Sequence, residues 1–246
     1  MNSVFYLDTF LFAILPYMVA ITFFPVTIVR YLARGFTYSS LSSQFLENQQ
    51  HFWGLVPFHY GILAVTAGHL AAFLLPAQVL AWNTQPVRLY LLEITGLAFA
   101  GLTLIGLSAA LVRRFTSSKV RMVTSTRDWV LFWLLIIQIA SGIGVAIFHP
   151  WGSSWFAATL TPYIWSLFKL SPNLTAVSAM PLLVKFHIVN AYLVIGYFPF
   201  TRLVHVLVVP NPYLWRKPQV VRWYATPASQ KTGLPGTPDG RRQWAK

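Results

Sequence analysis

The 246-residue chain contains no cysteine and very few acidic residues. Without a thiol it can form neither a cysteine-ligated iron–sulfur cluster, nor a thioether-attached haem, nor a disulfide. Asp and Glu together number 5, and charged residues make up only 9% of the chain, against about 25% in a typical soluble domain. Hydrophobic residues make up 56%. This composition predicts a protein built for a lipid environment.

The hydrophobic residues are concentrated in five stretches, 4–29, 52–76, 89–112, 129–148 and 183–209. Each has about 20 to 27 residues, which is enough to cross a hydrocarbon core of about 30 Å as a helix. Helices are expected because a lipid-exposed backbone must satisfy its own hydrogen bonds. The sequence therefore predicts an all-α membrane protein with a five-transmembrane-helix bundle.

The connections between the stretches suggest further organisation. Residues 77–88 are predicted to be a short loop, whereas 150–182 are long and aromatic enough to hold a helix lying along the membrane surface. We divide the chain into a membrane domain, 1–224, and a polar, proline-rich tail, 225–246, which is expected to lie in the cytoplasm.

The positive charges are distributed asymmetrically. Lys and Arg number 18, giving a net charge of +13, and fifteen of them lie in alternate parts of the chain, 30–34, 113–127 and 202–246. The positive-inside rule then predicts an N-terminus outside and a C-terminus in the cytoplasm. Topology and anionic membrane lipids explain the basic surface, with an acidic partner subunit as a second possibility. No nucleic-acid partner is predicted.

Four histidines lie within two of the apolar stretches: His59 and His69 in the second, His187 and His205 in the fifth. Ionisable side chains are costly in a membrane and mark functional sites there. Two histidines on each of two helices can supply the axial ligands of two haems. Matching the residues by depth pairs His59 with His205 on the inner side and His69 with His187 on the outer side.

Helical geometry supports this pairing imperfectly. His187 and His205, 18 residues apart, would share one face about 27 Å apart, whereas His59 and His69 would be about 15 Å apart. Helix tilt could absorb the difference. For a single histidine, a hydrogen bond to a neighbouring helix is the simpler interpretation. Zinc needs three ligands converging on one ion, so pairs split between the membrane halves favour haem.

Two groups of further residues are candidates for the same site. Arg202 precedes His205 by about one helical turn, and together with Arg113 and Arg114 it could pair with haem propionates, although positive-inside anchoring explains these arginines equally well. Arg88 borders the third apolar stretch and could hydrogen-bond a quinone carbonyl, with Glu93 taking a quinol proton. A snorkelling anchor with a local ion pair is the alternative.

Three runs of sequence carry a family resemblance: FHYGILAVTAGH (58–69), LVRRFTSSKVRMVTSTRD (111–128) and KFHIVNAYLVIGYFPFTRLVH (185–205). Over residues 1–224 the chain resembles the gamma subunit of membrane-bound respiratory nitrate reductase. That family implies a di-haem cytochrome b in a bacterial or archaeal cytoplasmic membrane, with the four histidines as ligands of two haem b groups, paired by depth. It also implies a quinol site at Gly68, His69 and Arg88, although the family shows lysine near Arg88.

The resemblance implies partners and a reaction as well. The partners would be a cytoplasmic iron–sulfur beta subunit and a molybdenum-containing alpha subunit. The chain would be the quinol-oxidising part of a quinol:nitrate oxidoreductase, passing electrons inward from the outer haem. A related nitrite oxidoreductase would use a similar subunit with the opposite electron flow. From other functional classes, a proton-relaying transporter and a non-redox membrane anchor remain open.

Overall fold

The structure, a computed structural model, describes residues 2–38 and 49–208. Within these residues five helices are long and apolar enough to cross a membrane: Tyr6–Arg34, Trp53–Leu74, Pro86–Thr116, Thr126–Phe148 and Leu182–Phe200. The predicted all-helical fold with five candidate spans is thereby confirmed. The predicted boundary after residue 224 and the tail that follows it lie outside the described residues.

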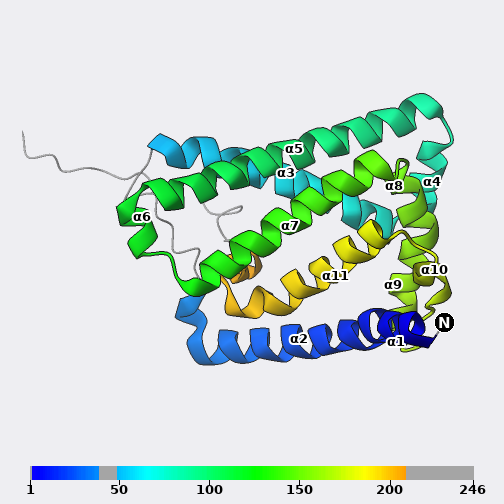
Figure 1. Ribbon diagram of the computed structural model, residues 1–246, viewed down its shortest axis with the longest axis horizontal. Helices are drawn as coiled ribbons and strands as arrows, with labels where there is room; N and C mark the ends of the chain where they lie inside the picture. Colours follow the sequence, from blue (N-terminus) through cyan, green and yellow to red (C-terminus); the bar gives the residue numbers. More distant parts are fainter. Residues whose placement is uncertain (1, 39–48, 209–246) are drawn as a thin grey trace, which may run out of the picture. The chain divides into compact units, whose positions relative to one another are not determined.

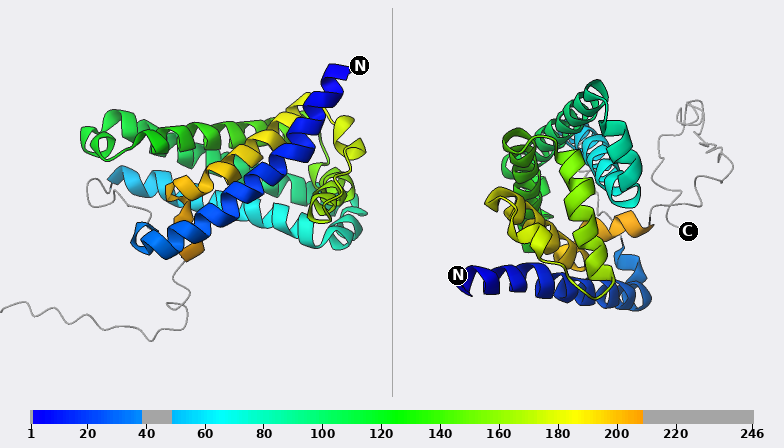
Figure 2. Two further views of the ribbon diagram at one scale, coloured as in Figure 1. Left: turned by 90° about the horizontal axis from the view of Figure 1, so that it is seen from below. Right: turned by 90° about the vertical axis from the view of Figure 1, so that its right-hand side faces the viewer.

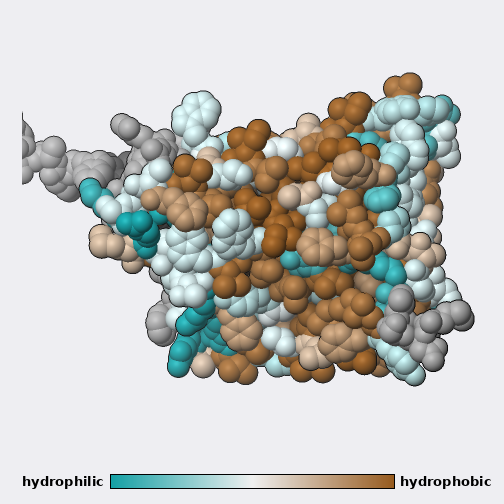
Figure 3. Space-filling view, in the orientation of Figure 1, coloured by the Kyte–Doolittle hydropathy of each residue, from teal (hydrophilic) through white to brown (hydrophobic). Residues whose placement is uncertain are grey.

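The flanks of these helices expose large apolar side chains (Figure 3). Ile21, Leu32 and Leu182 are 70%, 77% and 83% exposed. Such a contiguous apolar surface is rare in soluble monomers and suits contact with lipid. The chain is therefore a multi-pass membrane protein.

The long helices pack in a definite order (Figures 1 and 2). Successive neighbours are α3 (Gln49–Leu74), α5 (Pro86–Thr116), α7 (Thr126–Phe148), α11 (Leu182–Tyr197) and α2 (Leu15–Arg34). Over the described residues α3 and α11 make no extensive contact with each other. The two histidine-bearing helices are therefore joined through α5 and α7.

Helices α3 and α5 approach closely because glycines face the partner backbone. A Cβ on Gly61 would lie 2.7 Å from the Phe99 carbonyl oxygen, and one on Gly106 would lie 2.6 Å from the Gly54 carbonyl oxygen. Both distances are far below normal contact, so larger residues would force the helices apart. Small residues at membrane helix interfaces serve this purpose.

The first span contains a change of helical type. Helix α1 (Asn2–Thr9) continues through a π turn (Phe10–Ile14) into α2, where Pro16 has no N–H to offer the carbonyl of Phe12. The buried Tyr163 hydroxyl donates to that carbonyl instead, at 2.7 Å. Burial and the neighbouring Tyr192 raise the pKa of the Tyr163 phenol, which therefore remains a hydrogen-bond donor.

One end of the bundle is covered by short helices (Figure 1). The segment predicted as a loop contains α4 (Pro76–Asn83), so that prediction was wrong. The helix expected within 150–182 is present, as α8 (Gly152–Trp155), a π turn (Phe156–Leu160) and α9 (Thr161–Phe168), followed by α10 (Thr175–Ser178). At the opposite end, the short helix α6 (Ser118–Met122) lies between α5 and α7.

The sequence predicted one continuous helix over the fifth stretch, 183–209, but the structure shows a break in it. Helix α11 ends at Tyr197, a 3-10 turn covers Phe198–Phe200, Thr201 is extended, and a second 3-10 segment covers Arg202–Val208. Pro199 lacks the N–H that the helix would need there. His187 and His205 therefore do not lie on one straight helix, and the spacing of about 27 Å calculated for such a helix does not apply.

Candidate cofactor-binding site

The two histidines of α3 are oriented by their own helix. His59 Nδ1 lies 2.7 Å from the Leu55 carbonyl oxygen, and His69 Nδ1 lies 2.8 Å from the Val65 carbonyl oxygen. Because a carbonyl can only accept, each Nδ1 carries the proton and donates it. Each Nε2 is then left as the ring's lone-pair nitrogen, the form in which imidazole binds a metal.

His205 has the same arrangement in the 3-10 segment after α11. Its Nδ1 donates to the Arg202 carbonyl oxygen at 2.6 Å, three residues earlier. The side chain is half-buried. Three imidazoles are thus fixed by the carbonyl of a preceding residue, each with Nε2 available.

His187, on α11, is oriented by a neighbouring helix instead. Its Nδ1 lies 2.9 Å from Ser141 Oγ on α7. The Ser141 hydroxyl donates to the Gln138 carbonyl at 3.1 Å, so it accepts the proton of His187 Nδ1. The ring lies against Gly142, where a Cβ would be only 2.9 Å from His187 Cε1. A glycine is required for this close approach.

A second polar side chain of α7 reaches the same imidazole. Gln138 Nε2 lies 3.2 Å from His187 Nε2. The amide of Gln138 is itself held by the buried Asn190, whose Nδ2 donates to Gln138 Oε1 at 2.8 Å and to the Leu134 carbonyl at 3.0 Å. None of Ser141, Gln138 and Asn190 was predicted from the sequence as a site residue. Their polarity inside apolar helices was the signal that could have found them.

The pairing of the four histidines as ligands stays a prediction, although two of them lie close together. His69 and His187 are close enough to interact electrostatically, and the His69 ring lies 5.5 Å from the Phe156 ring in the π turn beside α8. His205 lies at the opposite end, near α6. Among the described residues no cluster of three or more His, Asp or Glu side chains could hold a metal ion.

The three arginines considered as propionate partners lie close to one another and to Asp128, and Arg202 precedes His205 by three residues. Arg202 forms an ion pair with Asp128 at 2.8 Å and also donates to the Val123 carbonyl. Arg114 donates to the Ala110 carbonyl, and its guanidinium lies 4.1 Å above the Phe132 ring. Arg113 is buried and interacts electrostatically with Arg114. Arg114 and Arg202 thus have protein partners, and a propionate contact stays a prediction for all three.

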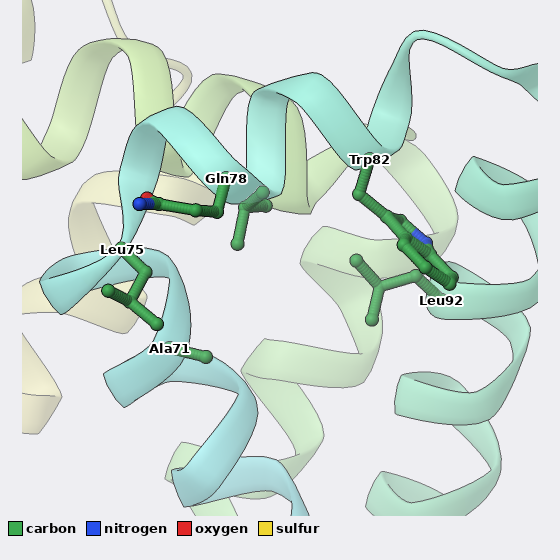
Figure 4. A pocket seen from close by; sticks show the side chains of 6 residues that line it. Ala71, Leu75, Gln78, Trp82 and Leu92 are labelled. Carbon is green, nitrogen blue, oxygen red and sulfur yellow. The ribbon is translucent and has the colours of Figure 1, made fainter.

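The residues considered for a quinol site lie at the other end of the bundle. The Arg88 guanidinium lies 5.1 Å from the Trp82 ring, and Trp82 Nε1 donates to the Arg88 carbonyl. A Cβ on Gly68 would meet no atom within 4 Å, so the surface next to His69 is open. Beside Trp82 is a groove of about 340 Å³ (Figure 4), lined by Ala71, Leu75, Gln78, Val79, Trp82 and Leu92.

Glu93 has a structural contact that the sequence did not reveal. Its Oε1 accepts from the backbone N–H of Ser153 at 2.9 Å and from the Ser153 hydroxyl at 2.6 Å. These groups are at the first turn of α8, where free N–H groups and the helix dipole favour a carboxylate. Glu93 therefore anchors α8 to α5. The proposed proton transfer would have to compete with these hydrogen bonds.

Comparison with known proteins gives a consistent result. The family model described as nitrate reductase gamma subunit matches residues 8–224. The nitrate reductase gamma chain of Bacillus subtilis (strain 168) is 31% identical over 86% of this chain and 96% of its own length. The respiratory nitrate reductase 2 and 1 gamma chains of Escherichia coli (strain K12) are each 32% identical over 88% of this chain and 97% and 98% of their own lengths.

Proposed function

Because the chain belongs to the nitrate reductase gamma subunit family, we propose that it oxidises quinol and passes the electrons through two b-type haems. Family membership makes it the membrane electron-transfer subunit of a respiratory nitrate reductase complex. In the proposal His69 and His187 ligate one haem, and His59 and His205 ligate the other.

The observation that carries the haem proposal is the state of the imidazoles. His59, His69 and His205 each donate Nδ1–H to a carbonyl of the same chain, which leaves Nε2 unprotonated. Haem-ligating histidines need this tautomer and this fixed ring orientation. Two of the ligands come from α3, and the other two come from α11 and from the 3-10 segment after it. Because α3 and α11 make no extensive contact with each other, a macrocycle could bridge the two sides. His59, His69 and His205 therefore fit the group. His187 would do so once its Nε2 exchanges the Gln138 amide nitrogen, 3.2 Å away, for iron.

Bound haem supplies one-electron transfer at its iron; the surrounding residues have to place the quinol and direct its protons. Arg88 can donate a hydrogen bond to a quinol oxygen but cannot accept a proton. The protons would therefore pass to water at this face. The open surface at Gly68 leaves room for the quinol ring beside His69, and the apolar groove beside Trp82 suits its hydrocarbon tail.

The charge distribution supports an orientation for this transfer. With the basic segment 113–127 in the cytoplasm, the α6 end faces inward and the α4 end faces outward. Electrons then move from the outer haem to the inner one, and on to an iron–sulfur beta subunit and a molybdenum alpha subunit. Each electron that moves inward against an inside-negative potential costs about 2.3 kcal/mol per 100 mV. The direction of flow therefore matters energetically.

Spectroscopy of the intact complex tests the proposal. We expect two b-type haems per chain, reduced by quinol. His69→Ala and His187→Ala should each remove the same haem, and His59→Ala and His205→Ala should each remove the other. A folded wild-type complex without haem in this chain would refute the proposal and favour a transporter or a simple anchor. Losing different haems in His69→Ala and His187→Ala would refute the pairing. Reduction of the haems when nitrite is supplied to the soluble subunits as the electron donor would indicate electron flow in the reverse direction.

A further inference from the structure

The break after α11 leaves backbone carbonyls that no helix satisfies. Pro199 and Thr201 lie between the end of α11 and the 3-10 segment that carries His205. Arg30, near the end of α2, donates from Nη1 to the Pro199 carbonyl and, at 3.0 Å, to the Thr201 carbonyl. One guanidinium from a distant part of the chain therefore satisfies both carbonyls.

The remaining nitrogens of Arg30 are held by Thr37, which lies just beyond the end of α2. Nε donates to Thr37 Oγ1 at 3.1 Å and Nη2 donates to the Thr37 carbonyl at 3.0 Å. The guanidinium also lies 5.4 Å from the Tyr38 ring. Thr37 Oγ1 donates in turn to the Arg34 carbonyl. Arg30 is thus held rigidly at the end of α2, and its Nη1 is aimed at the break.

The backbone after the break is fixed tightly up to His205. Thr201 is buried, and its hydroxyl donates to the Phe198 carbonyl at 2.9 Å and accepts from Leu203 N at 3.1 Å. Val204 is completely buried. Any displacement at the Thr201 carbonyl would therefore be transmitted to the imidazole four residues later.

We propose that Arg30 is the positioning residue for the inner-haem ligand His205, which it holds through the backbone of Pro199 and Thr201. The inference rests on the proposed function and adds a residue to it. An arginine is needed because its planar fork reaches two carbonyls and Thr37 at once. A lysine ammonium would keep the charge but cannot make the same set of hydrogen bonds.

Arg34 provides a matched control, because it is exposed on the same helix end and carries the same charge. If Arg30 acted only as a positive charge that sets membrane topology, Arg30→Gln and Arg34→Gln would have the same effect. Arg30→Lys would then have no effect on haem content. If Arg30 positions His205, Arg30→Gln and Arg30→Lys should lower the haem content from two per chain towards one. The lost or altered signal should be the one that is missing in His205→Ala, and Arg34→Gln should keep both haems.

A second readout does not depend on haem. Since the chain has no cysteine, Val206→Cys, at a position 51% exposed, provides the one thiol of this chain for a spin label, and labelled wild-type complex gives the background from other subunits. We expect the label to become more mobile in Arg30→Gln and Arg30→Lys than in Arg34→Gln. The milder Thr37→Val, which removes one acceptor, should give an intermediate effect.

The outcomes separate the two proposals. A haem-free wild-type complex would refute the proposed function, while the label would still show whether Arg30 fixes this segment. Two unaltered haems and an immobile label in Arg30→Gln and Arg30→Lys would overturn the positioning role. An equal loss of haem in Arg34→Gln would assign the effect to the loss of a positive charge, and it would also overturn the positioning role of Arg30.

Discussion

Gly142 gives the sharpest prediction about His187, the proposed ligand of the outer haem. A Cβ at this position would lie 2.9 Å from His187 Cε1 and 3.6 Å from each ring nitrogen. Carbon atoms pack favourably at about 3.5–4.0 Å, so Gly142→Ala would push the ring by about 0.6 Å or more. Ser141, the adjacent residue, holds His187 Nδ1 and opposes that movement.

Such a shift exceeds what a metal–ligand bond tolerates, which is about 0.2 Å. Forcing an extra methyl group into a packed site typically costs about 1–3 kcal/mol. If this cost falls on ligation, the affinity for the outer haem falls about 5- to 150-fold. Gly142→Ala should therefore lose this haem, or bind it with an altered midpoint potential, and keep the inner haem.

Gly144 supplies the matched control on the same helix. A Cβ there would meet Leu183 Cδ2 at 3.3 Å, and a leucine side chain can turn away. We expect Gly144→Ala to keep both haems, as measured by haem content, redox titration and electron paramagnetic resonance of the ferric haems. A Gly142→Ala variant that matches the wild type in all three measurements would refute this prediction, as would a Gly144→Ala variant that loses as much haem.

Three further changes test individual contacts. Ser141→Ala removes the acceptor of the His187 Nδ1 proton, so the imidazole would donate less electron density to iron. The outer haem alone should then shift to a higher midpoint potential, and an unchanged redox titration would contradict this. Tyr163→Phe leaves the Phe12 carbonyl unpaired and should lower the free energy of unfolding by about 1–3 kcal/mol, which thermal unfolding in detergent would measure. Glu93→Gln should weaken the anchoring of α8 and lower thermal stability, but leave the pH profile of quinol oxidation unchanged; an altered profile would restore a proton-transfer role.

The spans could be predicted from hydropathy alone, but their ends could not. The stretch 183–209 stays apolar across Pro199, and hydropathy does not register a missing N–H group. The break becomes evident only when Arg30 is seen to satisfy the freed carbonyls. Likewise α4 was missed because its eight residues, Pro76–Asn83, are too short to stand out as an apolar stretch.

Part of the candidate site could likewise be predicted from the sequence, and part of it could not. Four histidines within apolar stretches stand out in the sequence, because ionisable residues in such stretches are rare. The partners of His59 and His69 lie four residues earlier on the same helix, so they follow from helix geometry. The partners of His187 come from α7, 46 and 49 residues away, and depend on how two helices pack.

This difference between the histidines has a consequence for biogenesis. His59 and His69 acquire their orientation as soon as α3 is helical, because their partners Leu55 and Val65 belong to the same helix. His187 acquires its orientation only after α11 has docked on α7 and brought Ser141 and Gln138 alongside. The proposed outer-haem pocket should therefore be completed late in maturation. An intermediate that lacks the fifth helix would present one histidine of each proposed ligand pair already aligned to capture porphyrin.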